Sequence, residues 1–332
     1  MLCLIDNSTD PYFNLAAEEY LLTAYDKPIF RLWRNSPCIV IGKYQNALAE
    51  INHEYVRPNG IKVVRRLSGG GAVFHDSGNI NFTFIDKRLK GEDTNEMFRR
   101  FTSPILSALK NIGIEARLEG RNDLTIGGKK FSGNAICLHK DRILQHGTLL
   151  FSSSMANLSG ALNARPEKFI GKNVQSNVSR VTNISEHLPE NSQMDVAQFI
   201  NYLEKFITKI NDNGIWERYD YSEKDLEAIH KLRDEKYTSD EWIFGNSPKY
   251  DFQHTFKLPC GLFDVFLKVD EGKITDCHIA GDYFFLRPSE DISNALIGTR
   301  HNYEAIISAL KQFDLKDYFG ADIAEEFTNN II

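Results

Sequence analysis

The sequence predicts an α+β protein, with a large first domain built on a mixed sheet with helices on its outer faces, and a small α/β domain at the C-terminal end. Short apolar or alternating runs, typical of strands, are interspersed with longer segments of helical periodicity. The 332 residues suffice for one large domain and one small one. A change of pattern near Trp242 to Pro248 places the domains at residues 1–244 and 245–332.

The first domain is expected to open with a strand, Leu2 to Ile5, and a helix, Tyr12 to Tyr25, which Asp10 caps and which has Pro11 in its first turn. Apolar runs predict further strands at Pro28 to Arg34, Cys38 to Gly42, Ile61 to Val64, Ile80 to Ile85, Ile114 to Leu118, Asp123 to Ile126, Lys130 to Leu138 and Ile143 to Ser152. Helical periodicity predicts helices at Thr94 to Ile112, Val196 to Ile210 and Ser222 to Lys236.

The second domain is predicted to contain both element types. Strands are expected about Tyr250 to Phe256, Leu262 to Val269 and Ile274 to Ala280. Helices are expected about Ile292 to Ile297, Tyr303 to Phe313 and Ile323 to Phe327.

Composition narrows the class of protein. A formal net charge of −6 argues against a general nucleic-acid binder. The five cysteines are scattered and form no Cys-x-x-Cys pair, so the sequence suggests neither a disulfide framework nor a zinc site and fits a reducing cytosol. We expect no signal peptide, and no apolar run reaches membrane-spanning length. These features predict a cytoplasmic protein without nucleic-acid or membrane partners.

One stretch, from Arg65 to Asn79, stands out because three consecutive glycines lie between two predicted strands. Without a Cβ, successive backbone N–H groups can converge on an anion. Arg65 and Arg66 add positive charge, and His75 adds a donor that can titrate. The alternative interpretation is a tight β-turn with incidental charges.

Two further places could carry chemistry. Lys130 opens a strand after Gly127-Gly128, and its compact charge suits bridging a carboxylate oxygen and a phosphate. Two lysines after a glycine turn can also be a solvated hairpin tip. Asn122 and Asp123 could hold Mg²⁺ with water and phosphate, although the residues alone favour a plain Asn-Asp turn, which is very common. From the residues alone, both alternatives remain open.

A third candidate is the basic tract from Arg165 to Thr182, which has little periodicity and the length of a functional loop. We expect Ala164 to Thr182 to be mobile in the free protein, because its four cations repel one another and bury little. An ordinary surface loop is the alternative.

Together these motifs resemble those of the lipoate–protein ligase family. Arg-Arg-x-Ser-Gly-Gly-Gly-Ala-Val-Phe-His-Asp, at residues 65–76, resembles the family's lipoate-binding loop. Segments at residues 120–124, 130–135, 146–150 and 172–182 are similar to further family motifs and follow in the family's order. The resemblance covers nearly the whole chain, and it implies the fold shared by biotin ligases and class II aminoacyl-tRNA synthetases.

The resemblance implies an ATP-dependent ligase that converts lipoate, and octanoate as well, to the acyl-adenylate with the help of Mg²⁺. The acyl group would then pass to a specific lysine on a lipoyl domain of a 2-oxoacid dehydrogenase subunit or on the glycine-cleavage H protein. Burying an alkyl chain in the acyl tunnel would stabilise the complex by roughly 0.8 kcal/mol per methylene.

The resemblance also assigns residues. Lys130 would be catalytic, and Asn122 and Asp123 would lie at the Mg²⁺. ATP or the adenylate would be bound by Arg66, Gly71, Ala72, Val73, Phe74, Lys130, Lys172 and Arg180. Lipoate would be bound by Trp33, Arg66, Ser68, Gly70, Gly71, His75, Lys130 and His146. The tract at residues 165–182 would close over the adenylate.

Two other functions fit parts of this pattern. Related octanoyl and lipoyl transferases use a cysteine nucleophile instead of ATP, and Cys137 follows Lys130 closely, although no cysteine here matches their motif. A non-catalytic protein that binds lipoate or lipoyl domains is the second alternative. It would not need the residues predicted to hold Mg²⁺ and phosphate. A biotin ligase is a more remote possibility, because its glycine-rich motif differs.

Overall fold

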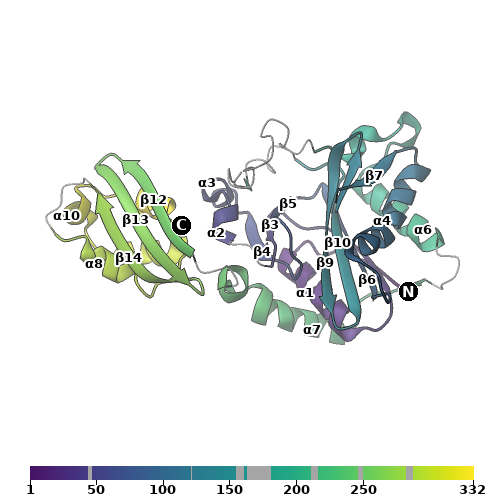
Figure 1. Cartoon of the computed structure of the whole chain (residues 1–332), viewed down its shortest axis with the longest axis horizontal. Helices are drawn as coiled ribbons and strands as arrows, with labels where there is room; N and C mark the ends of the chain where they lie inside the picture. The colour runs from purple at the N-terminus through teal and green to yellow at the C-terminus, as the bar shows by residue number, and fades with distance from the viewer. Residues whose placement is uncertain are drawn as a thin grey trace. The chain divides into compact units, whose positions relative to one another are not determined.

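The computed structural model describes residues 1–43, 47–120, 122–154, 161–162, 181–210, 216–245, 250–281 and 287–332. The chain forms two compact units, coloured from purple to green and from green to yellow for most of their length in Figure 1. The first unit comprises Met1–Lys43 and Ile61–Thr238, and the second comprises Tyr44–Gly60 and Ser239–Ile332. The N-terminal part of the sequence therefore contributes a short segment to the second unit.

A mixed sheet is the framework of the first unit. Within the described residues it has eight strands in the order β11-β1-β2-β6-β10-β9-β8-β7. Their bounds are β1 (Leu2–Ile5), β2 (Ile29–Trp33), β6 (Asn79–Lys87), β7 (Ala116–Glu119), β8 (Asp123–Ile126), β9 (Lys129–His139), β10 (Arg142–Leu150) and β11 (Glu217–Arg218). β1 runs parallel to β2 and β11, and the other neighbours are antiparallel. The predicted α+β class with a mixed sheet is confirmed.

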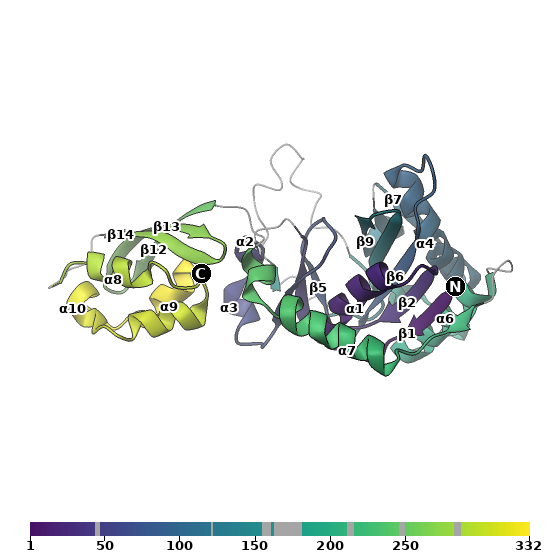
Figure 2. The ribbon, with the colours of Figure 1, turned by 90° about the horizontal axis from the view of Figure 1, so that it is seen from below.

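Helices cover both faces of this sheet (Figure 2). They are α1 (Pro11–Ala24), α4 (Thr94–Asn111), α6 (Val196–Ile210) and α7 (Glu223–Leu232), the last continued by a π-helical turn, η5 (Arg233–Tyr237). Short 3₁₀ turns η3 (Ile184–His187) and η4 (Glu190–Ser192) precede α6. The predicted start of α1 is confirmed, because Asp10 accepts a hydrogen bond from the Tyr12 backbone N–H and Pro11 occupies the first turn.

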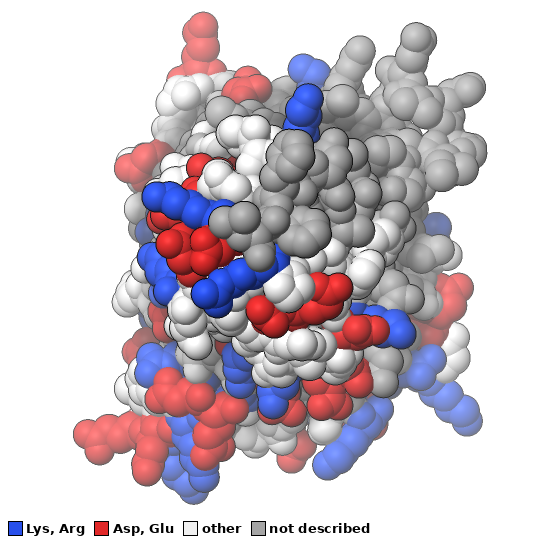
Figure 3. Space-filling model, turned by 90° about the vertical axis from the view of Figure 1, so that its left-hand side faces the viewer, with Lys and Arg blue, Asp and Glu red and all other residues white. Residues whose placement is uncertain are grey.

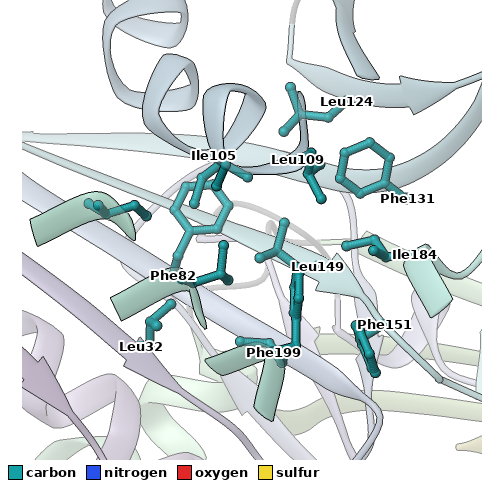
Figure 4. Close-up of a cluster of buried hydrophobic side chains, with 14 of the residues drawn as sticks. Leu32, Phe82, Ile105, Leu109, Leu124, Phe131, Leu149, Phe151, Ile184 and Phe199 are labelled. Atoms are coloured by element: carbon teal, nitrogen blue, oxygen red, sulfur yellow. The ribbon is translucent and has the colours of Figure 1, made fainter. Parts of the chain in front are cut away.

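Alternation along the strands decides which side chains meet which helices. In β2, Phe30 and Leu32 join the core under α4 and α6, whereas Ile29 packs with Leu21 and Leu22 of α1. The larger core is shown in Figure 4, where Leu32 and Phe82 of the sheet lie near Ile105 and Leu109 of α4 and Phe199 of α6. Arg31 and Trp33, which alternate with these core residues, point to the α1 side, where the candidate site lies.

A second, small sheet carries the glycine-rich stretch. It consists of β3 (Cys38–Ile41), β4 (Lys62–Arg65) and β5 (Val73–His75), in the order β4-β3-β5. The three glycines therefore join β4 to β5 around β3, not to the strand at residues 80–85 as the sequence predicted. β5 has only three residues and pairs with β3 far away in the sequence, with Cys38 opposite His75, so no local pattern marks it.

The second unit is a three-stranded antiparallel sheet with helices, as far as the described residues show. Its elements are β12 (Tyr250–Leu258), β13 (Gly261–Asp270), β14 (Lys273–Gly281), α8 (Glu290–Leu296), α9 (Tyr303–Leu310), α10 (Leu315–Phe319) and α11 (Ala324–Ile331), with the short turns α2 (Ala47–Glu50), α3 (His53–Val56) and η6 (Glu241–Gly245). At its centre Phe319 and Phe327 stack on each other, and Phe263 packs edge-to-face against both.

The surface charge and the apolar character of the helices bear on which partners the protein can bind. On the face shown in Figure 3, Lys and Arg side chains are interspersed with Asp and Glu side chains. None of the described helices combines the length and the apolar character that crossing a membrane requires.

Candidate active site

A cavity of about 160 Å³ lies in the first unit, where the small sheet meets α1, β2, β9 and β10. Residues predicted from the sequence that line it are Trp33, Arg66, Gly70, Gly71, Ala72, Val73, His75, Asn122, Lys130 and His146. The fold thus brings together residues that are more than one hundred positions apart. Leu15, Val40 and Asn81 also line the cavity. Nothing in the sequence marks these three residues, because they belong to ordinary helix and strand patterns.

The glycine loop between β4 and β5 is wrapped around Arg66. The Arg66 guanidinium donates to the backbone oxygens of Val40 (3.0 Å), Gly69 (2.7 Å) and Gly71 (2.8 Å). Gly70 adopts φ +91°, which favours glycine. Burial lowers the Arg66 pKa to about 10, which still leaves it charged at neutral pH. Arg66 therefore fixes the shape of the loop and places a buried positive charge beneath it.

Lys130 lies at the other side of the cavity, beside a break in strand pairing. The register of β8 with β9 shifts between Leu124 and Thr125, and such bulges redirect side chains. The Lys130 ammonium is 2.8 Å from the Asp123 carboxylate. It also lies across Gly133, where an added Cβ would come within 3.2 Å of Nζ. The lysine is thereby positioned by a strand and a carboxylate rather than by a free hairpin tip, whereas Lys129 is exposed.

A buried chain of hydrogen bonds connects the glycine loop to α1. His146 Nε2 is 2.6 Å from Ser68 Oγ, and His146 Nδ1 is 2.9 Å from the Glu18 carboxylate. Thr83 donates to Glu18 (2.5 Å), and Trp33 Nε1 donates to Thr83 (2.9 Å). The favourable interactions with His146, and further ones with Arg31 and Thr83, hold the Glu18 pKa below its usual value although burial acts to raise it. Glu18 was not among the predicted site residues.

Other predicted residues lie apart from the cavity wall. Ser68 is buried and is occupied by Arg66 and His146. Phe74 is buried, with its backbone opposite Ile39 in the small sheet. Asp123 contacts Lys130 rather than lining the cavity itself. Lys172, Arg180 and nearly all of the tract at residues 164–182 lie outside the described residues.

The residues proposed for Mg²⁺ fit such an ion chemically. Asp123 offers a carboxylate, and Asn122 offers an amide oxygen because its amide nitrogen already donates to the Asn134 carbonyl (2.6 Å). Mg²⁺ is commonly held by one or two such groups together with phosphate and water. Among the described residues, no group of three or more His, Cys, Asp or Glu side chains is arranged as a complete metal site. A nucleotide phosphate would therefore have to complete the coordination.

The cysteines are unsuited to nucleophilic chemistry. All five are free thiols, and none lines the cavity. Burial raises the pKa of Cys3 and Cys38 to about 12 and that of Cys277 to about 11, and it also raises the pKa of Cys137 and Cys260. A thiol held protonated is a weak nucleophile, so the structure disfavours a cysteine-dependent acyltransferase.

The site combines a cavity, a glycine-rich loop and a lysine positioned by a strand, an arrangement that fits an enzyme of the ligase class. Comparison with known proteins specifies the class further. A family model described as the lipoyl protein ligase A/B catalytic domain matches residues 10–208, and one described as the bacterial lipoate protein ligase C-terminus matches residues 247–331. The chain therefore belongs to the lipoate–protein ligase family.

Individual relatives agree with this assignment. The lipoate-protein ligase LplJ of Bacillus subtilis is 42% identical over 334 residues, which cover 99% of this chain and 100% of the relative. A solved bipartite lipoate protein ligase from Thermoplasma acidophilum, described with its E2 lipoyl domain, has a TM-score of 0.64 and 29% identity, covering 75% of this chain and 97% of its own. A solved structure of a lipoate-protein ligase A bound with ATP has a TM-score of 0.63 and 26% identity, and the match covers 74% of this chain and 98% of that ligase.

Proposed function

We propose that this protein catalyses the ATP-dependent ligation of lipoate, and of octanoate as well, to a specific lysine of an acceptor protein through a lipoyl-AMP intermediate. One observation carries the proposal: the Lys130 ammonium and the glycine loop lie on the same cavity. An acyl carboxylate bound there would be next to a cation and to backbone N–H groups that can bind phosphate.

In the first step a carboxylate oxygen of lipoate attacks the α-phosphate of ATP. A P–O bond forms to the acyl group, the bond to the β-phosphate side breaks, and pyrophosphate leaves. This reaction depends mainly on positioning and on cations around the phosphates. Lys130 stabilises the negative charge shared by the carboxylate and the α-phosphate. Gly71, Ala72, Val73 and the loop around them hold the acyl end and the phosphate.

In the second step the ε-amine of the acceptor lysine attacks the acyl carbonyl. The amide bond forms, the bond to phosphate breaks, the amine loses a proton, and AMP leaves. The cavity keeps the alkyl chain out of water, with Trp33 and Val73 among its walls. Phe74, Lys172 and Arg180 would contribute to the adenylate side, and Ser68 and His146 to the lipoate side.

Asn122 and Asp123 would hold Mg²⁺, which supplies charge neutralisation at the phosphates. The metal would then compete with Lys130 for the Asp123 carboxylate, so the ion pair between Lys130 and Asp123 would weaken when the nucleotide binds.

We infer three further properties. The acceptor is a lipoyl domain of a 2-oxoacid dehydrogenase subunit or the glycine-cleavage H protein. The enzyme works in the cytoplasm. Catalysis resides in residues 1–244, and residues 245–332 form an accessory domain. The separate core of the C-terminal residues and the two family matches support this division.

Pyrophosphate release is the direct test. The protein with lipoate and Mg-ATP should release pyrophosphate up to about one equivalent per site, and an apo lipoyl domain should make release continuous. Release without lipoate would contradict the proposal. So would acyl transfer that does not require ATP.

A further inference from the structure

His75 presents an unpaired polar atom to the cavity. Its ring is almost fully buried and lines the cavity beside Trp33, with ring centroids 6.3 Å apart. Among the described residues, His75 Nε2 has no hydrogen-bond partner. A buried polar nitrogen is costly unless something pairs with it, which points to a bound molecule as the partner.

Whether Nε2 carries a proton is decided on the far side of the ring. His75 Nδ1 is 3.1 Å from the side-chain amide nitrogen of Asn35. An amide nitrogen can only donate, so this contact makes Nδ1 the acceptor and puts the proton of the neutral ring on Nε2. The tautomer of His75 therefore depends on Asn35 turning its nitrogen, and not its oxygen, toward the ring.

The orientation of Asn35 follows from a chain that starts at Arg31. The Arg31 guanidinium can only donate, and it donates to Asn14 Oδ1 at 2.9 Å. The amide nitrogen of Asn14 therefore faces the other way. There it is 2.9 Å from two backbone oxygens, Ser8 O and Arg34 O, and 2.9 Å from Asn35 Oδ1. Since the nitrogen of Asn14 donates, Asn35 must turn its oxygen to Asn14 and its nitrogen to His75.

All members of this chain are buried, and Arg31 is itself anchored by Asp6, with Nε 2.6 Å from Oδ2. The direction of every hydrogen bond is thus fixed by a residue that cannot accept. Among the described residues, the charged or titratable groups that face His75 are Arg66, next to the small sheet, His146, from β10, and the Cys38 thiol, opposite His75 in β3. Burial keeps that thiol protonated by raising its pKa to about 12. Burial most of all, and then the interactions with Arg66 and His146, lower the His75 pKa to about 3, so the ring is neutral in the physiological range.

We propose that Asn35, held by Asn14 and Arg31, is a positioning residue that fixes the Nε2–H tautomer of His75, so that His75 donates a hydrogen bond to an acceptor atom of the acyl acid in the cavity. This inference rests on the proposed function for the identity of the ligand. A lipoate molecule offers only acceptors, namely its carboxylate oxygens and, more weakly, its ring sulfurs. A fixed donor therefore suits this ligand better than a histidine that could present a bare nitrogen.

The tautomer can be observed directly in the whole protein. The chain contains nine histidines, and ¹⁵N NMR of histidine-labelled protein, with His75→Phe to assign the signal, reports which ring nitrogen is protonated. We expect His75 Nε2 to be protonated and His75 Nδ1 to be unprotonated in spectra recorded from pH 6 to pH 8. Protonation at Nδ1 in the unaltered protein would overturn the proposal.

Asn35→Asp tests the positioning role with almost no change of shape. The carboxylate still accepts from Asn14, but its second oxygen now faces His75 Nδ1 and demands a proton there. At pH 8 the His75 ring should switch to the Nδ1–H tautomer, which leaves Nε2 unprotonated. Lipoate should then bind about ten-fold more weakly, because its acceptor atom would face a second acceptor, Nε2, instead of a donor. At lower pH the new carboxylate favours the imidazolium, which restores the Nε2–H donor, so affinity should recover as the pH falls. A merely structural role predicts no such recovery.

Calorimetric Kd values for lipoate and for octanoate, without ATP, provide the readout. If Asn35→Asp weakens the binding of both acids to a similar extent, the carboxylate is the acceptor of the hydrogen bond from His75. If it weakens the binding of lipoate alone, the acceptor is a ring sulfur. Asn302→Asp is the matched control. It makes the same exchange in the second unit, at a helix cap where Asn302 accepts from the Ala305 N–H and Asp caps equally well. This control should leave both Kd values unchanged.

If Asn35→Asp fails to fold, the tautomer of the unaltered protein and the lipoate affinity of His75→Phe still decide the question. An unchanged Kd in His75→Phe would overturn the proposal. Because these measurements involve no ATP, they are separate from the test of ligation. Absence of pyrophosphate release with the expected tautomer and lipoate binding would contradict the proposed function and leave this inference standing.

Discussion

Replacing Lys130 with alanine should abolish adenylate formation and leave the fold intact. The structure explains why the two effects separate. Lys130 and its partner Asp123 are both about one third exposed, at 35% and 39% of the side chain. Ion pairs of this exposure contribute about 0–1 kcal/mol to folding. Removal of the ammonium should therefore change the free energy of unfolding by no more than about 1 kcal/mol.

The effect on the reaction is expected to be far larger. The ammonium is positioned across Gly133 before any substrate arrives, so it can stabilise developing charge without reorganisation. Removing one such preorganised group typically costs about 10²–10³ in rate, or roughly 2.7–4 kcal/mol. We expect the rate of pyrophosphate release with lipoate and Mg-ATP to fall at least about 100-fold.

Lys129→Ala is the matched control, because Lys129 is the exposed neighbour at the start of the same strand. Its rate should stay within about two-fold of the unaltered protein, given that exposed charges contribute little. Thermal unfolding of both variants checks the fold. Normal pyrophosphate release from a folded Lys130→Ala protein would refute the catalytic assignment. So would a severe loss in Lys129→Ala.

Three other outcomes are expected. Cys137→Ser should retain ATP-dependent ligation, because burial raises the pKa of that thiol; loss of activity, with an acyl-cysteine trapped on the unaltered protein in mass spectrometry, would contradict this. Gly42→Ala should raise the KM for lipoate and lower the free energy of unfolding by about 1–3 kcal/mol, because a Cβ at this position would lie 2.1 Å from the Gly70 carbonyl oxygen. Gly69→Ala is the control, since a Cβ there would meet no neighbouring atom within 4 Å, and it should preserve the free energy of unfolding. Asp225→Asn should lower stability at pH 7 by about 2 kcal/mol, because the Asp225 carboxylate accepts from Tyr20, Tyr25 and Tyr219. Burial acts to raise the Asp225 pKa, but hydrogen bonds from Tyr20, Tyr219 and Ser222 outweigh it and hold the pKa below its usual 3.8. The contribution of the carboxylate to stability is therefore complete above that value and is lost as pH falls through the folded-state pKa. Urea unfolding should show a constant gap between the two proteins from pH 7 to pH 5 and a closing gap below pH 4; a gap that widens at low pH would be inconsistent with this reasoning.

Local sequence patterns determined most of the elements. Helix α1 was predicted to within one residue at each end, because Asp10 and Pro11 mark its start and apolar spacing marks its length. The strands β12, β13 and β14 were found from alternating apolar residues. Five-residue α10 was missed, since a helix of little more than one turn has too few positions for periodicity to show.

The sequence by itself also determined the family and the chemical parts of the site. Three consecutive glycines after two arginines, and a lysine just after a Gly-Gly pair, are visible in the sequence itself. Residues without a Cβ are the ones that allow backbone to approach another group closely, so these stretches could be recognised without coordinates.

Only the tertiary structure decided which way these parts face. Arg66 was expected from the sequence to bind phosphate, and the structure adds that its guanidinium donates to the carbonyl oxygens of Gly69 and Gly71 in the glycine loop. Glu18 looked like part of an acidic helix face, but it is buried against His146. The proton position on His75 depends on a chain of contacts that begins at Arg31. Side-chain direction and tautomer are set by partners far away in the sequence, and the local pattern of residues carries no information about them.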